Sequence, residues 1–198
     1  MAGAEDFYQP ERTWLVLMNE TDERALVQQA RQGDSRAFGV LVDRYQRVVY
    51  NLALRMVNDR DEAQDIAQTV FVKVFQNLDS YDPHYRFFSW IYRIALNESL
   101  NHRGRLRRHE ELDPGLESNG RGPDECAALG EVRTEIGNAL MQLTADYRTV
   151  VIMRHFLELN QVEMSQILEV PEKTVKSRLH TARRLLGDML SRKGITQP

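Results

Sequence analysis

The sequence contains a single cysteine, which limits both its covalent chemistry and its compartment. Cys126 is alone among 198 residues, so an intramolecular disulfide framework is excluded. One unpaired thiol fits a reducing environment, and we expect a cytoplasmic protein. The neighbouring Ala127 and Ala128 favour a small core residue over a redox sensor at this position.

Long apolar runs and metal-ligand spacings are also missing. The apolar stretch TWLVLM at 13–18 lies between Glu11 and Glu20 and is too short to span a bilayer. It does not have the form of a signal peptide, so we expect no direct insertion into a membrane. The five histidines and the one cysteine show no compact zinc-ligand spacing, so we predict no metal and no cofactor.

Strand-like alternation is absent as well, and the apolar residues instead recur with a helical period. Between Phe38 and Met56 they follow a spacing of about 3.6 residues, and the segment NDRDE then interrupts the pattern. We predict an all-α fold. The expected helices run from Thr21 to Ala30, from Asp34 or Ser35 to Met56, from about 60 to 78, from about 87 to 107, from 129 to 143, from Thr144 or Asp146 to 157, and over the two helices described below.

A change of composition divides the chain into two small helical domains. The segment HEELDPGLESNGRGP at 109–123 holds two prolines, three glycines and only two leucines, which is too little apolar surface to offset the entropy of ordering. We interpret it as a flexible linker; its acidic residues also allow a DNA-mimicking strand in a basic channel. The predicted divisions are an N-terminal extension at 1–20, a first domain at 21–108, the linker at 109–123, a second domain at 124–192 and a tail at 193–198.

The end of the chain predicts a helix-turn-helix. Asn160 is a good N-cap for a short helix, and Glu169 and Val170 make a tight connection to Pro171, which suits a first helical turn. In such a motif the second helix enters the DNA major groove.

The second helix of this motif has one apolar side and one cationic side. Val175, Leu179, Ala182 and Leu186 fall within an arc of about 60°. The opposite side, about 120° wide, is basic and polar. A solvated surface helix would show the same charges, but the preceding short helix favours DNA contact. The opposite side carries Lys173, Lys176, Ser177, His180, Arg183 and Arg184.

The balance of charge suggests that this domain does not bind DNA alone. The whole chain has a formal net charge of −3, whereas residues 169–198 hold seven Lys or Arg against three Asp or Glu. A mildly acidic chain with one small basic surface suggests that another body supplies much of the DNA affinity.

Three stretches of the sequence together resemble a known family. They are DEAQDIAQTVFVKVFQNL at 61–78, FFSWIYRIALNESLNHRGRLRR at 87–108, and TVKSRL at 174–179. In this order they resemble the bacterial RNA polymerase sigma factors, and more closely the extracytoplasmic-function (ECF) group, which has only the second and fourth sigma regions. The resemblance runs from about Thr21 to about Leu190 and implies sigma region 2 in the first domain and region 4 in the second.

The resemblance implies three sets of functional residues. The segment from Asp65 to Leu78 would dock on a coiled coil of the largest polymerase subunit; the loop SYDPHYR would hold a base flipped out of the minus-ten element, which requires a shaped pocket. Trp90 shares a face with Ile91 and Ile94, so we expect it in the core. The polymerase-binding set is Asp65, Gln68, Phe71, Lys73, Phe75 and Leu78; the minus-ten set is Tyr81, His84, Arg86, Phe88, Tyr92, Asn97, Asn101 and Arg103; the minus-thirty-five set is Lys173, Thr174, Lys176, Ser177, Arg178, His180, Thr181 and Arg183.

Some of these residues have a purely structural interpretation, and others suit one kind of DNA contact better than another. Phe71 and Phe75 could be core residues only, and the arginines that end the 87–107 helix would favour a helix C-terminus by themselves. Aromatic rings at Phe88 and Tyr92 could stack on unpaired bases. Arg178 lies at the flank of the apolar stripe, so it suits a phosphate contact better than base reading.

The resemblance implies partners and leaves two alternatives. The expected partners are core RNA polymerase, promoter DNA and an anti-sigma factor in a stress or envelope response; the polymerase performs the chemistry, so the chain is not an enzyme. The alternatives are a free-standing helix-turn-helix regulator and a helical adaptor that does not read DNA. The sequence departs from the family at Glu169 and Lys173, where glycine is common, and Glu169 predicts either a strained positive φ or a different turn.

Overall fold

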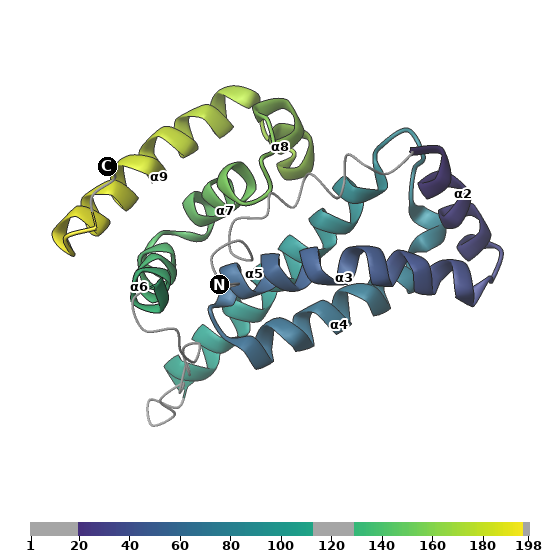
Figure 1. The fold of residues 1–198 in the computed structure, drawn as a ribbon, viewed down its shortest axis with the longest axis horizontal. Helices are drawn as coiled ribbons and strands as arrows, with labels where there is room; N and C mark the ends of the chain where they lie inside the picture. Colours follow the sequence, from purple (N-terminus) through teal and green to yellow (C-terminus); the bar gives the residue numbers. More distant parts are fainter. Residues whose placement is uncertain (1–19, 113–128, 196–198) are drawn as a thin grey trace.

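The computed structural model describes residues 20–112 and 129–195, and within these residues all the regular elements are helical (Figure 1). Four α-helices and a short 3₁₀ helix make up the first part, and four α-helices make up the second. The elements are α2 (Glu20–Arg31), α3 (Ser35–Val57), α4 (Arg60–Gln76), η1 (Leu78–Ser80), α5 (Phe87–Leu112), α6 (Leu129–Gln142), α7 (Ala145–His155), α8 (Gln161–Leu168) and α9 (Glu172–Arg192).

In the first part, α3 packs along both α4 and α5, and α2 lies across α3 (Figure 1). The predicted start of α3 at Asp34 or Ser35 is confirmed: the helix begins at Ser35, and the carboxylate of its N-cap, Asp34, accepts hydrogen bonds from the backbone N–H groups of Arg36 and Ala37 at 2.8 and 3.2 Å. The predicted interruption after α3 is also confirmed: Asn58 ends the helix in the left-handed region, and the Asp59 carboxylate caps α4. Side-chain caps of this kind satisfy backbone donors that a helix start leaves unpaired.

In the second part, α8 and α9 form the predicted helix-turn-helix. Asn160 and Glu163 make a reciprocal capping box at the start of α8, in which each side chain accepts a hydrogen bond from the other residue's backbone N–H. The turn between the helices passes through Glu169, which has φ 55°. Val175, Leu179 and Ala182 of α9 are buried against the other helices of the second part, as the apolar arc predicts.

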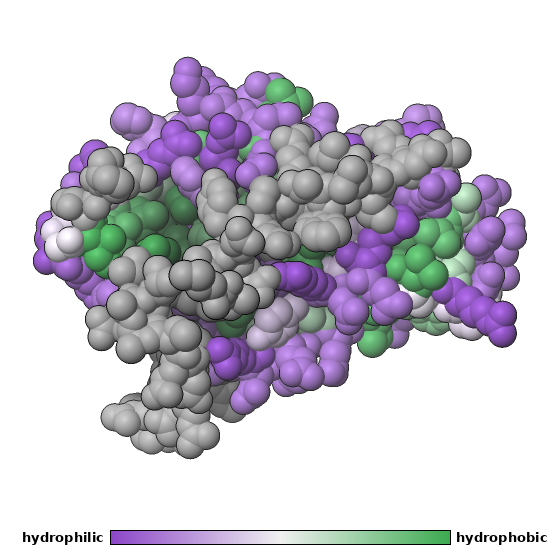
Figure 2. Space-filling model, in the orientation of Figure 1, coloured by the Kyte–Doolittle hydropathy of each residue, from purple (hydrophilic) through white to green (hydrophobic). Residues whose placement is uncertain are grey.

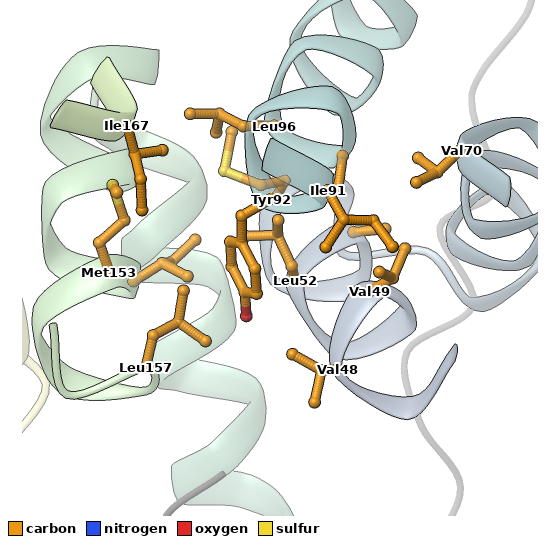
Figure 3. Close-up of a cluster of buried hydrophobic side chains, with 14 of the residues drawn as sticks. Val48, Val49, Leu52, Val70, Ile91, Tyr92, Leu96, Met153, Leu157 and Ile167 are labelled. Carbon is orange, nitrogen blue, oxygen red and sulfur yellow. The ribbon is translucent and has the colours of Figure 1, made fainter. Parts of the chain in front are cut away.

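The two parts pack against each other and share one hydrophobic core (Figure 3). On the side of α5, Tyr92 and Leu96 are buried, and opposite them Met153, Leu157 and Ile167 come from the second part. Complete burial of an aliphatic or aromatic side chain of this size contributes about 1.5–3 kcal/mol. The apolar contact therefore outweighs the exposed ion pairs at its rim, each of which contributes about 0–1 kcal/mol.

A buried arginine completes the contact between the two parts. Arg148 of α7 is 2% exposed, and its guanidinium donates to the backbone carbonyls of Leu140, Met141 and Leu143 at 2.7–2.9 Å. The same group donates to the carbonyl of Met56, in the last turn of α3, at 2.8 Å. These carbonyls belong to or adjoin the C-terminal ends of two helices, where backbone acceptors lack intrahelical partners and the helix dipole is negative. The Arg148 guanidinium thus supplies hydrogen-bond donors to backbone carbonyls at the ends of both helices.

The structure corrects two predicted boundaries. Helix α5 continues to Leu112, so the first residues of the predicted linker are helical. Pro171 stands one residue before α9 and is its N-cap, whereas we expected it within the first turn. The rest of the linker, Cys126, and the apolar stretch at 13–18 lie outside the described residues.

None of the helices in the part of the chain that the structure describes is long and apolar enough to cross a membrane.

Candidate nucleic-acid and protein interfaces

Helix α4 presents an exposed stripe that is polar near the middle of the helix and apolar toward its C-terminal end. Asp65 and Gln68 are exposed near its middle, and Val72 and Phe75 are 54% and 58% exposed one and two turns later. The Phe75 ring meets the edge of Phe38 of α3, with ring centroids 5.1 Å apart. Figure 2 shows mostly hydrophilic residues on the described surface of the side it displays, interrupted by separate apolar patches. The exposed apolar side chains on the adjoining helices α3 and α4 therefore make this stripe a candidate binding surface.

Three residues of the predicted polymerase-binding set have structural roles. Leu78 is buried in the core, so in this structure its side chain is not accessible to a partner. Phe71 is half-buried and packs against the core. Lys73 donates to the carboxylate of Glu98, which is buried on α5, at 2.5 Å. A buried carboxylate requires such a partner, so Lys73 ties α4 to α5.

The loop between η1 and α5 is held in shape by its own side chains. The Tyr81 hydroxyl donates to the carbonyl of Tyr85 at 2.6 Å, and burial, followed by the charge of Glu23, raises the pKa of Tyr81 to about 12, so the hydroxyl keeps its proton. The Asp82 carboxylate accepts from the backbone N–H of His84 at 3.0 Å and contacts its ring Nδ1 at 2.7 Å. These contacts hold the pKa of Asp82 below its ordinary value. The loop is therefore ordered by local hydrogen bonds.

This loop exposes residues that the sequence prediction did not all identify. His84 and Arg86 are exposed as predicted, and Tyr85, which we did not predict, is 58% exposed. Tyr81, which we did predict, is buried beneath the loop and packs edge-on against Phe87. The sequence offers no signal that separates the two rings, because Tyr81 and Tyr85 both belong to the loop SYDPHYR and only Tyr85 is exposed.

Helix α5 places its predicted DNA-contacting residues in different environments. Asn97 and Asn101 are exposed and lie four residues apart, so they share a face. Phe88 is half-buried, and its ring centroid lies 4.4 Å from that of Tyr92. Tyr92 itself is 1% exposed in the core between the two parts, so its ring is not accessible to a base in this arrangement. Arg103 belongs to α5, and its side chain lies outside the described residues.

The aromatic residues around the start of α5 support the loop from inside. Trp90 packs against the core, as expected, and its ring lies 5.5 Å from Tyr81 and 5.6 Å from Phe87, centroid to centroid. Ring contacts of this kind add about 0.5–1.5 kcal/mol each to the burial of the rings. The packed rings of Tyr81, Phe87 and Trp90 thus anchor the loop to the first part of the fold.

Helix α9 exposes the predicted cationic side. Two of its arginines are held by neighbours: Arg178 pairs with Asp146 of α7 at 2.6 Å, and the Arg183 side chain donates to His155 at 3.4 Å. Partial burial of the imidazole, followed by the positive charges of Arg183 and Arg154, lowers the pKa of His155. Lys173, Lys176, Ser177, His180, Arg183 and Arg184 are exposed, and Thr174, Arg178 and Thr181 are half-buried.

The described residues offer no alternative site for metal chemistry. Among residues 20–112 and 129–195, no group of three or more His, Cys, Asp or Glu side chains could hold a metal ion. The exposed polar residues named above on α5 and α9 are amides, hydroxyls, an imidazole and cations, which bind phosphates and base edges.

Comparison with known proteins accounts for the two parts separately. Residues 41–109 match Sigma-70 region 2, and residues 133–186 match Sigma-70, region 4. The ECF RNA polymerase sigma factor SigW of Bacillus subtilis is 32% identical over 176 residues, which are 83% of this chain and 94% of that protein. The ECF RNA polymerase sigma-E factor of Escherichia coli (strain K12) is 30% identical over 184 residues, which are 87% and 96% of the two chains.

Solved structures share the same arrangement of helices. CnrH in complex with the cytosolic domain of CnrY has a TM-score of 0.67 and 27% identity, over 86% of this chain and 98% of that one. The sigma factor RpoE in complex with the anti-sigma factor NepR, from Bartonella quintana, is similar in fold, with a TM-score of 0.68 and 20% identity over 78% and 96% of the chains. Because both sigma regions match in order and the relatives align over nearly their whole length, the chain belongs to the ECF RNA polymerase sigma factors, which are transcription initiation factors and not enzymes.

Proposed function

We propose that this sigma factor binds core RNA polymerase through the exposed stripe of α4. The observation that supports this surface most is the exposure of Val72 and Phe75 on a helix whose other face is fully packed. Exposed apolar side chains become the buried centre of a protein interface, and polar neighbours become its rim. Here Asp65 and Gln68 supply the rim, and Phe38 extends the apolar part onto α3.

The minus-ten element binds the loop at 81–86 and the exposed side of α5. Tyr85 is the exposed ring of the loop, and base stacking on an aromatic side chain contributes about 1–3 kcal/mol. His84 and Arg86 flank it, and Asn97 and Asn101 offer amides to base edges farther along the helix. Tyr81 positions the loop from below without contacting DNA itself.

The minus-thirty-five element binds the cationic side of α9. Lys176, Ser177, His180 and Arg183 reach the major groove in this assignment, because the first turns of a recognition helix meet the base edges. Arg178 is turned toward Asp146, so it contacts the phosphate backbone only if that ion pair opens.

An anti-sigma factor controls this protein in the cytoplasm, in a stress or envelope response. The two solved relatives described above are complexes, one with the cytosolic domain of CnrY and one with the anti-sigma factor NepR. This chain shares their fold over most of its length, which supports a partner of the same class.

The polymerase-binding surface is tested by matched substitutions of exposed apolar residues. Val72→Asp and Phe75→Asp should each weaken binding to purified bacterial core polymerase about tenfold or more, because a charge then faces an apolar contact. Val162→Asp is the control, since Val162 is 48% exposed on α8, in the other part of the molecule. Circular dichroism checks that all three variants keep their helices. Undiminished binding by both α4 variants would refute this surface.

A further inference from the structure

The helix-turn-helix contacts α5 through Arg93, a residue of the first part of the fold. One nitrogen of the Arg93 guanidinium donates to the Glu169 carboxylate at 2.6 Å, and the other donates to the backbone carbonyl of Gln166 at 2.9 Å. Glu169 is the residue between α8 and α9, and Arg93 follows the buried Tyr92. The contact therefore joins residues 73–76 positions apart across the two parts of the fold.

Glu169 occupies a position where its side chain has a conformational cost. Its φ of 55° lies in the left-handed region, which glycine adopts freely and a glutamate does not. The turn itself does not need a side chain here, because the backbone N–H of Glu169 and that of Val170 both donate to the carbonyl of Ser165. What glutamate adds over glycine is the carboxylate that Arg93 binds.

A second carboxylate of the helix-turn-helix, Glu163, faces a second arginine of the first part of the fold, Arg86. Glu163 of α8 lies 3.8 Å from the Arg86 guanidinium, and its other oxygen caps the Asn160 backbone. Arginine recognises carboxylates and phosphates by the same planar donor geometry. Two acidic groups of region 4 thus stand against two cations at the start of α5.

We propose that Glu169, assisted by Glu163, is an intramolecular latch that occupies Arg93 and Arg86 in place of promoter phosphates. The closed packing and DNA binding by α5 then exclude each other, because they use the same guanidinium groups. Opening also exposes Tyr92, which the closed packing buries under Met153, Leu157 and Ile167 (Figure 3). The inference rests on the proposed promoter-binding role of the loop and α5.

The strength of the latch follows from its exposure. The Arg93 and Glu169 side chains are 39% and 71% exposed, so the ion pair changes the balance between closed and open forms by no more than about fivefold. The shared apolar contact contributes most of the free energy that stabilises the closed state. The Arg93–Glu169 ion pair sets how readily DNA displaces region 4 from α5. A sensitive population measurement is therefore needed.

The conformational test uses spin labels on the full-length chain. Gln28→Cys and Ser191→Cys, at exposed positions on α2 and α9, carry the labels in a Cys126→Ser background. Glu169→Arg and Arg93→Glu should each shift the distance distribution toward longer separations, and the two together should restore the short one. Distributions that do not change in either single variant would overturn the latch.

The competition test uses a fluorescent single-stranded DNA of mixed sequence. Glu169→Gln should bind it up to about fivefold more tightly than the parent chain. Glu172→Gln, which removes the same charge three residues away on the first turn of α9, should show a smaller change. Equal effects of the two variants would overturn the competition for phosphate. If neither the parent nor any variant binds this DNA, the promoter-binding role of α5 fails, and the spin-label distances still decide the latch.

Discussion

At the scale of single residues, Arg148 shows how one charged side chain can join two helical units. Its four hydrogen bonds end on carbonyls near the C-terminus of α6 and at the last turn of α3. Each such bond has a charged donor, and bonds of this kind contribute about 1.5–3 kcal/mol. Without the guanidinium, buried carbonyls would lose their partners, which is more costly than the loss of a surface charge.

We predict that Arg148→Met lowers the free energy of unfolding by about 3 kcal/mol or more, because the methionine fills the space but leaves buried carbonyls unsatisfied. Urea denaturation followed by circular dichroism measures the change. Arg47→Met, at an exposed position of α3, is the control and should change stability by less than about 0.5 kcal/mol. A loss of similar size in both variants would contradict this role for Arg148.

Residues such as Arg148, Tyr81 and Tyr92 mark the limit of sequence reasoning about the site. The sequence identified an aromatic cluster near the start of α5, but which ring faces solvent depends on packing between distant segments. Tyr92 is covered by residues of α7 and α8, more than 50 positions away, and no local period encodes that contact. Arg148 left one signal that we did not use: a charged residue three and four positions before the buried Val151 and Ile152.

At the scale of elements, the sequence predicted most of the helices because their starts and faces are local properties. Asp34, Asn58 and Asn160 mark helix ends through caps or left-handed turns, and these act within a few residues. The end of α5 was less well predicted: HEEL reads as the beginning of a linker, yet it continues the helix to Leu112. The sequence does hold a stop signal, Pro114, two residues beyond Leu112, and we did not use it to place the end of this helix.

The packing of α9 on α7 gives a dependence on pH. His155 lies at this contact and accepts from Arg183, and its pKa is lowered from the ordinary 6.5. As the pH falls below 6.5, the unfolded chain takes up this proton before the folded chain does, so stability is lost. We predict that His155→Gln removes part of this dependence of stability on pH. Denaturation at pH 7.5 and 5.5 should show a larger loss for the parent chain; equal losses would contradict the assignment.

At the scale of the whole molecule, both the net charge and the packing of the two parts limit DNA binding by the free protein. The chain carries a net charge of −3 and concentrates its basic residues on α9 and the end of α5, so its own attraction to DNA is limited. The closed packing of the two parts, with Glu163 and Glu169 against α5, further reduces DNA binding by the free protein. Binding of α4 to polymerase would then supply the affinity that the isolated chain lacks.

The most direct test of the account is run-off transcription with purified bacterial core polymerase and a pool of genomic promoter fragments. The parent protein should produce transcripts with discrete starts, and Lys176→Ala with Arg183→Ala should reduce them tenfold or more, since each lost contact costs about 1–3 kcal/mol. Arg192→Ala, on the last turn of the same helix, should retain them. Transcripts that survive the double substitution, or DNA binding by the protein alone with no transcripts at all, would contradict promoter reading through α9.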